Sequence, residues 1–134
     1  MERKVIKLGA KDLPSILYVE ERAFIPSIRT HRKNIVQRLK EGHIYLGAEV
    51  EGKIVGTLAY RFARFTPDFS DFKQRYSTFK EYAELPNEPN SNAVFVYSIG
   101  VLPDCRDWIN AKNLLMKAQE LSKLDHIVII CGHY

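Results

Sequence analysis

The sequence predicts a mixed α/β domain in which helices pack on one layered sheet, and three observations support this fold class. Strand-like and helix-like segments follow one another in the order β-α-α-β-β-(α)-β-α-β, with no internal repeat. The continuous apolar run over residues 127–130 is typical of a strand that is covered on both faces. A chain of 134 residues buries roughly two-thirds of the surface that it exposes when unfolded, so one domain over residues 1–134 is expected.

The first strand and the first helix are marked by short local signals. Residues 5–8 predict a strand that ends at Gly9. Asp12 is a good N-cap, because its carboxylate can accept hydrogen bonds from the first free amides of a helix. Pro26 ends that helix. The positions at helical spacing within it are Leu13, Ile16, Leu17, Glu20 and Phe24.

A second helix and a hairpin follow. Thr30 can cap this helix, and Gly42 closes it. Its apolar stripe consists of Ile35, Val36 and Leu39. Residues 44–50 and 53–62 are rich in strand formers and flank the tight turn Glu51-Gly52, which predicts a β-hairpin.

An aromatic insertion over about residues 63–92 separates the hairpin from the next strand. Its aromatic residues recur at helical spacing and predict an amphipathic helix over about residues 68–85, followed by a loop rich in Pro and Asn. Three interpretations stay open: a lid or wall of an acceptor pocket, a dimer contact, and a helix packed on its own domain.

The C-terminal third reads as strand, loop, helix and strand. Residues 93–101 form the strand, which Pro103 ends, and residues 127–130 form the last strand. The helix between them carries the apolar stripe Ala111, Leu114, Leu115, Ala118 and Leu121. A helix N-terminus placed directly after a strand presents unpaired amides and is a natural seat for phosphate.

Composition and charge exclude several classes of protein. No apolar run approaches the roughly 20 residues that span a bilayer, so no membrane segment is predicted. With no signal peptide, the two cysteines, Cys105 and Cys131, are expected as free thiols in the cytoplasm. Cys131-Gly132-His133 has no second pair at ligand spacing, which predicts no metal site.

The basic excess of the chain is concentrated in residues 29–40. This segment contains no acidic residue and five basic ones: Arg29, Arg32, Lys33, Arg38 and Lys40. It can be a solvated helix face or a site for an anionic partner. No recognised DNA- or RNA-binding motif accompanies it, so the sequence does not favour nucleic acid as a partner.

The segment from the fourth strand into the following helix resembles the GNAT superfamily of N-acetyltransferases. Members carry a valine, a proline, an arginine and a paired leucine there, and this chain has Val101, Pro103, Arg106, Ala111, Leu114 and Leu115 at matching places. Residues 51–56 are similar to the hairpin between the second and third strands of the family. The resemblance implies a GNAT-like acyl-CoA N-acyltransferase fold over nearly the whole chain.

What the resemblance implies is acetyl transfer from acetyl-CoA to an amine, on a small molecule or a peptide. The pyrophosphate would lie on the segment Arg106, Asp107, Trp108, Ile109, Asn110 and Ala111. The backbone of Ile99, Gly100 and Val101 would pair with pantetheine and the thioester oxygen. The candidate for the base that deprotonates the amine is Tyr97, with Glu49 as a second, and either can also be an ordinary strand residue.

Two departures from the family pattern leave an alternative open. The family usually has glycine where this chain has Asp107 and Ile109, so the alternative is a non-catalytic GNAT-like binding module with impaired CoA binding. The family also continues past its fifth strand with a helix and two further strands, whereas this sequence ends at Tyr134. The apolar edge at residues 127–131 is then expected to be covered by a second subunit in a homodimer, or by N-terminal elements.

Overall fold

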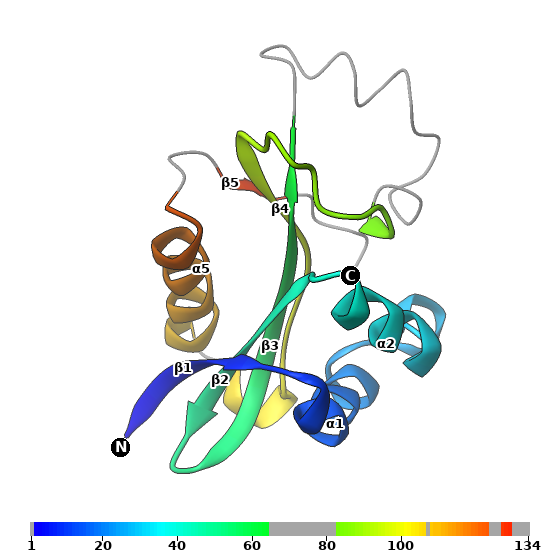
Figure 1. The fold of residues 1–134 in the computed structure, drawn as a ribbon. Helices are drawn as coiled ribbons and strands as arrows, with labels where there is room; N and C mark the ends of the chain where they lie inside the picture. Colours follow the sequence, from blue (N-terminus) through cyan, green and yellow to red (C-terminus); the bar gives the residue numbers. More distant parts are fainter. Residues whose placement is uncertain (1, 65–82, 107, 124–126, 130–134) are drawn as a thin grey trace.

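The structure is a computed structural model that describes residues 2–64, 83–106, 108–123 and 127–129 (Figure 1). Its sheet has five strands in the order β1-β2-β3-β4-β5. The strands are β1 (Arg3–Leu8), β2 (Ile44–Val50), β3 (Lys53–Ala63), β4 (Ala93–Val101) and β5 (Ile127–Ile129). Neighbouring strands from β1 to β4 are antiparallel, whereas β4 and β5 are parallel.

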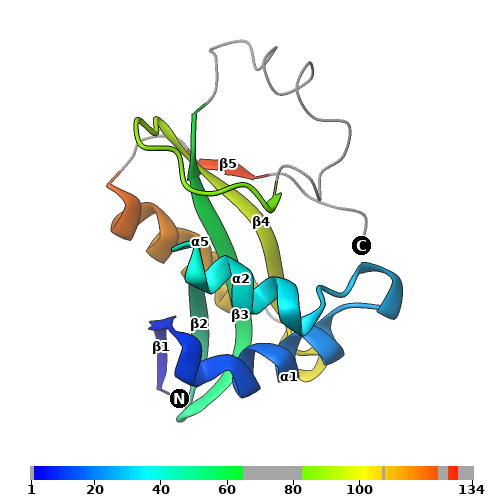
Figure 2. The ribbon, with the colours of Figure 1, turned by 45° about the vertical axis from the view of Figure 1, so that its right-hand side comes forward.

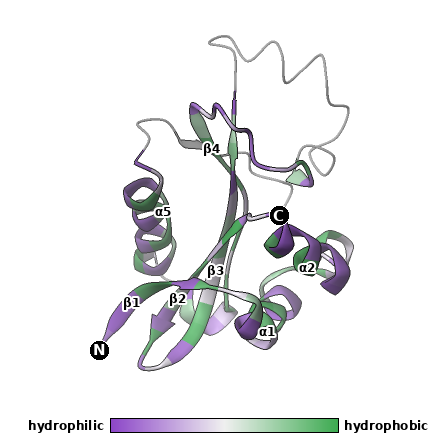
Figure 3. Cartoon of the chain, viewed as in Figure 1, coloured by the Kyte–Doolittle hydropathy of each residue, from purple (hydrophilic) through white to green (hydrophobic). Residues whose placement is uncertain are grey.

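Helices cover both faces of this sheet, as Figure 2 shows from a second side. One face carries η1 (Ala10–Asp12), α1 (Leu13–Ala23), η2 (Pro26–Ile28) and α2 (Arg32–Lys40); the other carries η3 (Pro103–Cys105) and α5 (Trp108–Ser122). Each helix combines hydrophobic and hydrophilic residues, which is the pattern of a helix with one face on a sheet (Figure 3). The predicted α/β order is therefore confirmed, apart from the segment that lies outside the described residues.

Two clusters of buried side chains form the core. The first joins Ile16 of α1 and Ile35 of α2 to Phe95 of β4. The second joins Leu114 of α5 to Leu58 of β3. Successive residues of a strand point to opposite faces, so the strands contribute to both clusters, and α1 also contributes Val19 to the second.

The hairpin between β2 and β3 has the predicted turn. Val50 pairs with Lys53, which leaves Glu51 and Gly52 as a two-residue loop. Both loop residues have positive φ, at 49° and 82° respectively, as a type I′ turn requires. Gly42 also closes α2 as predicted, with a φ of 86°.

The predicted caps differ from the observed ones. Asp12 lies at the N-cap of α1, but its carboxylate accepts a hydrogen bond from Gly9 N at 2.8 Å, because the turn η1 precedes the helix. Thr30 does not cap α2, since the helix begins at Arg32 with His31 at its N-cap. The amide of Thr30 instead donates to the carboxylate of Glu20 on α1, at 2.6 Å.

The expected apolar stripe of α5 is shorter than predicted. The helix buries Leu114 and Ala118, whereas Leu121 is 42% exposed. Buried positions of α5 recur every four residues from Asn110 onward, and Leu121 lies off that row.

Most of the predicted aromatic helix lies outside the described residues. Its end is described: Ala83 is buried in the core on the α1–α2 face, and Leu85 packs against the same cluster. This end of the insertion therefore packs on its own domain. In the part of the chain that the structure describes, no helix is long and apolar enough to cross a membrane.

Candidate functional site

A β-bulge interrupts the pairing of β3 and β4. Tyr60 pairs with Val96 and the preceding Ala59 pairs with Ser98, so Tyr97 is an extra residue on β4. Because the extra residue shifts the alternation, Val96 and Ile99 contact the same core cluster although three positions separate them. Within the described residues, the pairing of β4 with β5 extends to Val96, where the bulge begins.

Within the described residues, the C-terminal half of β4 presents a strand edge. Leu102 N donates to Val55 O at 2.8 Å, which points this amide toward β3. The N–H and C=O of one peptide group point in opposite directions, so the carbonyl of Val101 points to the outer edge. The backbone groups of Ile99, two residues earlier, point to the same side. Among the described residues, no strand pairs with this part of the edge.

A groove of about 420 Å³ lies along this edge. Its lining brings together six of the nine residues predicted to bind the cofactor, with two residues from the end of α1. The predicted residues are Ile99, Gly100, Val101, Arg106, Trp108 and Ala111, and the others are Ala23 and Phe24. Ile109 is 47% exposed and outside this lining, and Asp107 lies outside the described residues.

The guanidinium of Arg106 ties the two walls of the groove together. Its Nε donates to Val101 O at 3.1 Å, and its Nη2 donates to Ala23 O at 2.9 Å. Ala23 is the last residue of α1, where a cation is favourable because the helix dipole is negative at this end. Arg106 thus occupies the outward carbonyl of β4 and holds the end of α1 against it.

Gly100 permits a close approach between the same two walls. A Cβ at this position would lie 2.7 Å from Phe24 Cζ and 2.8 Å from Phe24 Cε2. Contacts this short do not occur between real side chains, so Phe24 packs here only because residue 100 has no side chain. The glycine predicted to meet the cofactor therefore also has a packing role.

The first turn of α5 closes the groove at its other end. The helix begins at Trp108, which is 72% exposed, so Ile109 lies in helical conformation. The family usually has glycine at the position of Ile109, but in the described part of the chain only Glu51 and Lys123 combine a side chain with positive φ. A β-branched residue is compatible with the geometry that Ile109 has.

The side chain of Asn110 stabilises this turn through hydrogen bonds. It is 3% exposed, its Nδ2 donates to Cys105 O at 3.0 Å, and its Oδ1 accepts from Arg3 Nη1 at 2.9 Å. These bonds hold the turn η3 and the strand β1 to the start of α5. The amide side chain of Asn110 therefore supports the segment, and Asn110 is outside the lining of the groove.

No protein-family model and no curated protein matches this chain. Solved structures do match it. The loading GNATL domain of CurA from Lyngbya majuscula is 17% identical with a TM-score of 0.75, and the match covers 100% of this chain and 68% of that one. The GphF GNAT-like decarboxylase in complex with isobutyryl-CoA is 16% identical with a TM-score of 0.72, over 98% and 68% of the two chains.

A third match is a GNAT family acetyltransferase from Brucella melitensis in complex with acetyl-CoA. It is 15% identical with a TM-score of 0.64, over 98% of this chain and 77% of that one. The chain has the GNAT fold. At these identities the similarity establishes the fold alone, which confirms the architecture that the resemblance implied.

Tyr97, the predicted base, does not line the groove of this GNAT fold. Its hydroxyl lies 2.8 Å from His43 Nδ1, and His43 Nε2 lies 2.7 Å from Leu85 O. Because a carbonyl can only accept, Nε2 carries the proton and Tyr97 donates to Nδ1. Burial raises the pKa of Tyr97 well above its ordinary value and lowers the pKa of His43, so both are neutral at pH 7.

A chain of hydrogen bonds continues from Tyr97 to α2. Tyr97 also hydrogen-bonds the hydroxyl of Tyr45, which accepts from Arg38 Nη1 at 3.1 Å. Arg38 is 5% exposed and pairs with Glu84, to which its Nε donates at 2.9 Å. A neutral Tyr97 held in this way keeps its proton, and its role as a base stays a prediction.

The basic segment predicted from residues 29–40 is not one surface. Arg38 lies in the core with Glu84 as its partner, so at most four of the five cations face solvent. Glu49, the second candidate base, lies on β2 and pairs with Lys4 on β1 at 3.4 Å. Within the described residues, no group of three or more His, Cys, Asp or Glu side chains can hold a metal ion.

Sequence reasoning missed the buried polar residues Glu20 and His43, and the half-buried Glu84. Glu20 occupied a position at helical spacing in α1, which is the one signal that pointed to its burial. Nothing local marks His43 or Glu84, because their partners lie 54 and 46 positions away along the chain.

Proposed function

We propose that this chain is an acyltransferase of the GNAT superfamily that moves an acetyl group from acetyl-CoA to an amine. The observation that carries the proposal is the groove, in which the outer edge of β4 after the bulge, Arg106 and the first turn of α5 meet. Structures with this fold have been solved in complex with acetyl-CoA and with isobutyryl-CoA, which supports an acyl-CoA as the ligand.

The residues of the groove suit the parts of this ligand. The outward backbone groups of Ile99 and Val101 can pair with the amides of a pantetheine arm. The amides at the start of α5 and the guanidinium of Arg106 can hold a pyrophosphate, which is favoured at a helix N-terminus. Arg106 would then exchange its two carbonyl partners for phosphate oxygens, to which a guanidinium binds more strongly.

The reaction needs little covalent chemistry from the protein. The amine nitrogen attacks the thioester carbonyl, the C–S bond breaks, and the CoA thiolate takes one proton. A backbone N–H on the outer edge of β4 can stabilise the oxyanion that forms in between. Tyr97, the predicted base, lies on the bulge beside this edge, and it would act only if its hydrogen bond to His43 opens.

The alternative is a GNAT-like module that binds a partner without catalysis. One observation favours it: Arg106 donates to Val101 O, the outward carbonyl of the edge that pantetheine would use. Binding of CoA without turnover, or no binding at all, distinguishes this alternative from the enzyme.

The test uses Trp108, the single tryptophan of the chain, which lies at the groove. Titration with CoA is expected to change its fluorescence, and Arg106→Gln is expected to weaken binding about tenfold, or ~1.4 kcal/mol. Arg64→Gln, the same substitution at an exposed arginine outside the groove, is the matched control. Release of CoA thiol from acetyl-CoA with a panel of amines then tests turnover.

No fluorescence change at millimolar CoA would refute this proposal, and a change without thiol release would favour the binding module. The predicted homodimer and the cytoplasmic location stay predictions. Light scattering during size-exclusion chromatography tests the first of these directly.

A further inference from the structure

The groove along β4 leaves one end of an acyl-CoA without a partner. The proposed function assigns the pantetheine arm to β4 and the pyrophosphate to the start of α5, and it assigns no residue to the adenosine end. This end carries a flat purine base and a phosphate on the 3′-hydroxyl of its ribose. It must leave the groove beside the pyrophosphate, so its partners are to be sought around the first turn of α5.

Trp108 is the exposed aromatic residue at this end of the groove. Its side chain lines the groove, yet the residue is 72% exposed. In the described part of the chain, no ring contact or cation–π contact engages the indole. An indole left in water forgoes the favourable burial of a large apolar surface. A flat ring that stays open at the surface can instead serve as a platform on which a base stacks.

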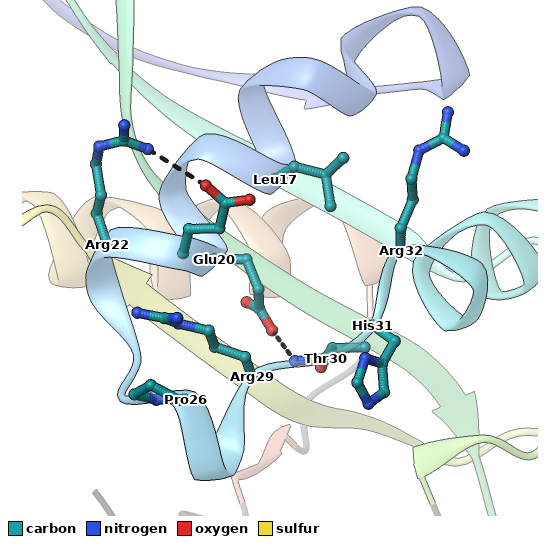
Figure 4. Close-up of a pocket in the computed structure, with 9 residues that line it drawn as sticks. Leu17, Glu20, Arg22, Pro26, Arg29, Thr30, His31 and Arg32 are labelled. Atoms are coloured by element: carbon teal, nitrogen blue, oxygen red, sulfur yellow. Dashed lines mark hydrogen bonds and ion pairs between the residues drawn. The ribbon is translucent and has the colours of Figure 1, made fainter.

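The opposite wall of the groove, at the end of α1, is less suited to a base. Among the described residues, the exposed aromatic side chain of α1 is Tyr18, and the guanidinium of Arg22 lies 3.6 Å above its ring. Arg22 also pairs with Glu21 at 3.7 Å, and it lines a separate pocket between α1 and the start of α2 (Figure 4). The ring and the cation on this side are therefore already engaged with each other.

Lys112 lies one turn after Trp108 on α5. At about 100° per residue, Trp108 lies about 60° round the helix from Ala111, which lines the groove, and Lys112 about 40° further in the same direction. Helical side chains lean toward the N-terminus of their helix, so Lys112 can reach back over the turn that holds Trp108. Lys112 is exposed, and none of the ion pairs between described residues includes it. A ligand that leaves the groove round α5 therefore meets an aromatic ring first and a cation next.

We propose that Trp108 binds the adenine ring of CoA by stacking and that Lys112 binds the 3′-phosphate of the same ligand. The aromatic face of the base matches the indole, and the phosphate anion matches the ammonium. The inference rests on the proposed function, because it extends the acyl-CoA site from the groove onto the outer face of α5.

A stacking site for adenine selects the class of acyl donor. Phosphopantetheine, whether free or attached to a carrier protein, contains neither an adenine nor a 3′-phosphate. It therefore gains nothing from Trp108 or Lys112, whereas stacking of a base on an aromatic side chain changes affinity by about tenfold. The protein should favour thioesters of free CoA over thioesters carried on phosphopantetheine alone.

Calorimetric titration with three ligands isolates the two contacts, and it does not depend on the fluorescence of Trp108. The ligands are CoA, dephospho-CoA, which lacks the 3′-phosphate, and phosphopantetheine, which lacks the whole adenosine end. CoA is expected to bind at least about tenfold more tightly than phosphopantetheine. Dephospho-CoA should bind about threefold less tightly than CoA, because the contact with Lys112 is exposed to solvent.

Variants of the two residues then assign each contact. Trp108→Leu should weaken CoA binding about tenfold and leave phosphopantetheine binding unchanged, whereas Trp108→Phe, which keeps a ring, should retain most of the affinity. Met116→Ala, which removes another exposed apolar side chain of α5, is the matched control. Lys112→Gln should weaken the binding of CoA but not of dephospho-CoA. Lys33→Gln, at an exposed lysine of α2, should change neither.

The outcomes separate this inference from the proposed function. Equal affinity of the wild-type protein for CoA and phosphopantetheine would overturn the inference, and so would a loss in Trp108→Leu that both ligands share. In either case phosphopantetheine still binds, so the proposed function stands. No binding of CoA or of phosphopantetheine at millimolar concentration would refute the proposed function, and the inference with it. An equal effect of Lys112→Gln on CoA and dephospho-CoA would overturn the assignment of the 3′-phosphate.

Discussion

Replacing Gly100 with alanine should destabilise the fold by a predictable amount, because the site of the new methyl group is already filled. The added Cβ would lie 2.7 and 2.8 Å from two ring atoms of Phe24 and 3.0 Å from Ala23 Cβ. Favourable carbon contacts lie at about 3.5–4.0 Å, so the ring must move by most of an ångström.

The surroundings oppose that movement. Phe24 is 6% exposed, and Arg29 and Arg106 hold the backbone carbonyls of Phe24 and Ala23. Overpacking of a core site costs about 1–3 kcal/mol. For a domain of this size we expect Gly100→Ala to lower the Tm by roughly 4–12 °C.

Urea unfolding, followed by circular dichroism, measures the free energy of unfolding for a set of four variants. Gly9→Ala is the matched control, since no atom lies within 4 Å of its Cβ position, and it should change stability by less than about 0.5 kcal/mol. Phe24→Leu removes the clashing ring atoms. In that background Gly100→Ala should cost at least about 1 kcal/mol less than it does alone.

Two results would contradict this reasoning. Gly100→Ala could match Gly9→Ala in stability, which would mean that the two walls of the groove yield without cost. Alternatively, the effects of Gly100→Ala and Phe24→Leu could simply add, which would mean that the methyl group and the ring do not compete for space.

Three further predictions concern the turn at Glu51, the hydrogen bonds of Asn110 and the buried His43. Glu51→Asn should stabilise the hairpin by up to roughly 1 kcal/mol in urea unfolding, because asparagine tolerates positive φ better than glutamate; a loss of stability would contradict the type I′ turn. Asn110→Ala should lower the free energy of unfolding by about 1–3 kcal/mol in the same assay, because Cys105 O and Arg3 lose a buried partner. An unchanged urea midpoint would show that these hydrogen bonds do not stabilise the fold. The pKa of His43 in the fold lies below 6.5, so the unfolded chain takes up the proton first and stability should fall as the pH drops below about 6.5. His43→Phe should weaken this pH dependence while costing about 1–3 kcal/mol at pH 7, and thermal melts at pH 5 and pH 7 compare the two proteins.

Much of the fold follows from local patterns. The order of strands and helices, the Glu51-Gly52 turn and the closing role of Gly42 are encoded by short-range signals and appear where the sequence predicts them. The structure of the segment from Val101 to Ala111 could also be predicted, since a strand followed by a helix start is a local pattern. Six of the nine predicted cofactor residues line one groove for that reason.

The sequence alone could not predict which residues lie opposite one another at the site or which charged residues pair. Arg106 meets Ala23 at a distance of 83 positions along the chain, and Arg38 meets Glu84 at 46, so no window of sequence contains both members of either pair. The bulge at Tyr97 exists only in the register between β3 and β4. Its consequence, the shifted alternation of β4 beyond the bulge, has no signature in a single strand.

By itself, then, the sequence determined the elements, their order and the strand-loop-helix segment of the groove, because these depend on hydrophobic period and turn chemistry over a few residues. Only the tertiary structure decided which polar side chains are buried, as with Glu20 and Arg38, and which backbone groups stay accessible on β4. Burial and pairing depend on what the rest of the chain places opposite a residue, and that is the physical reason why they appear only once the chain is folded.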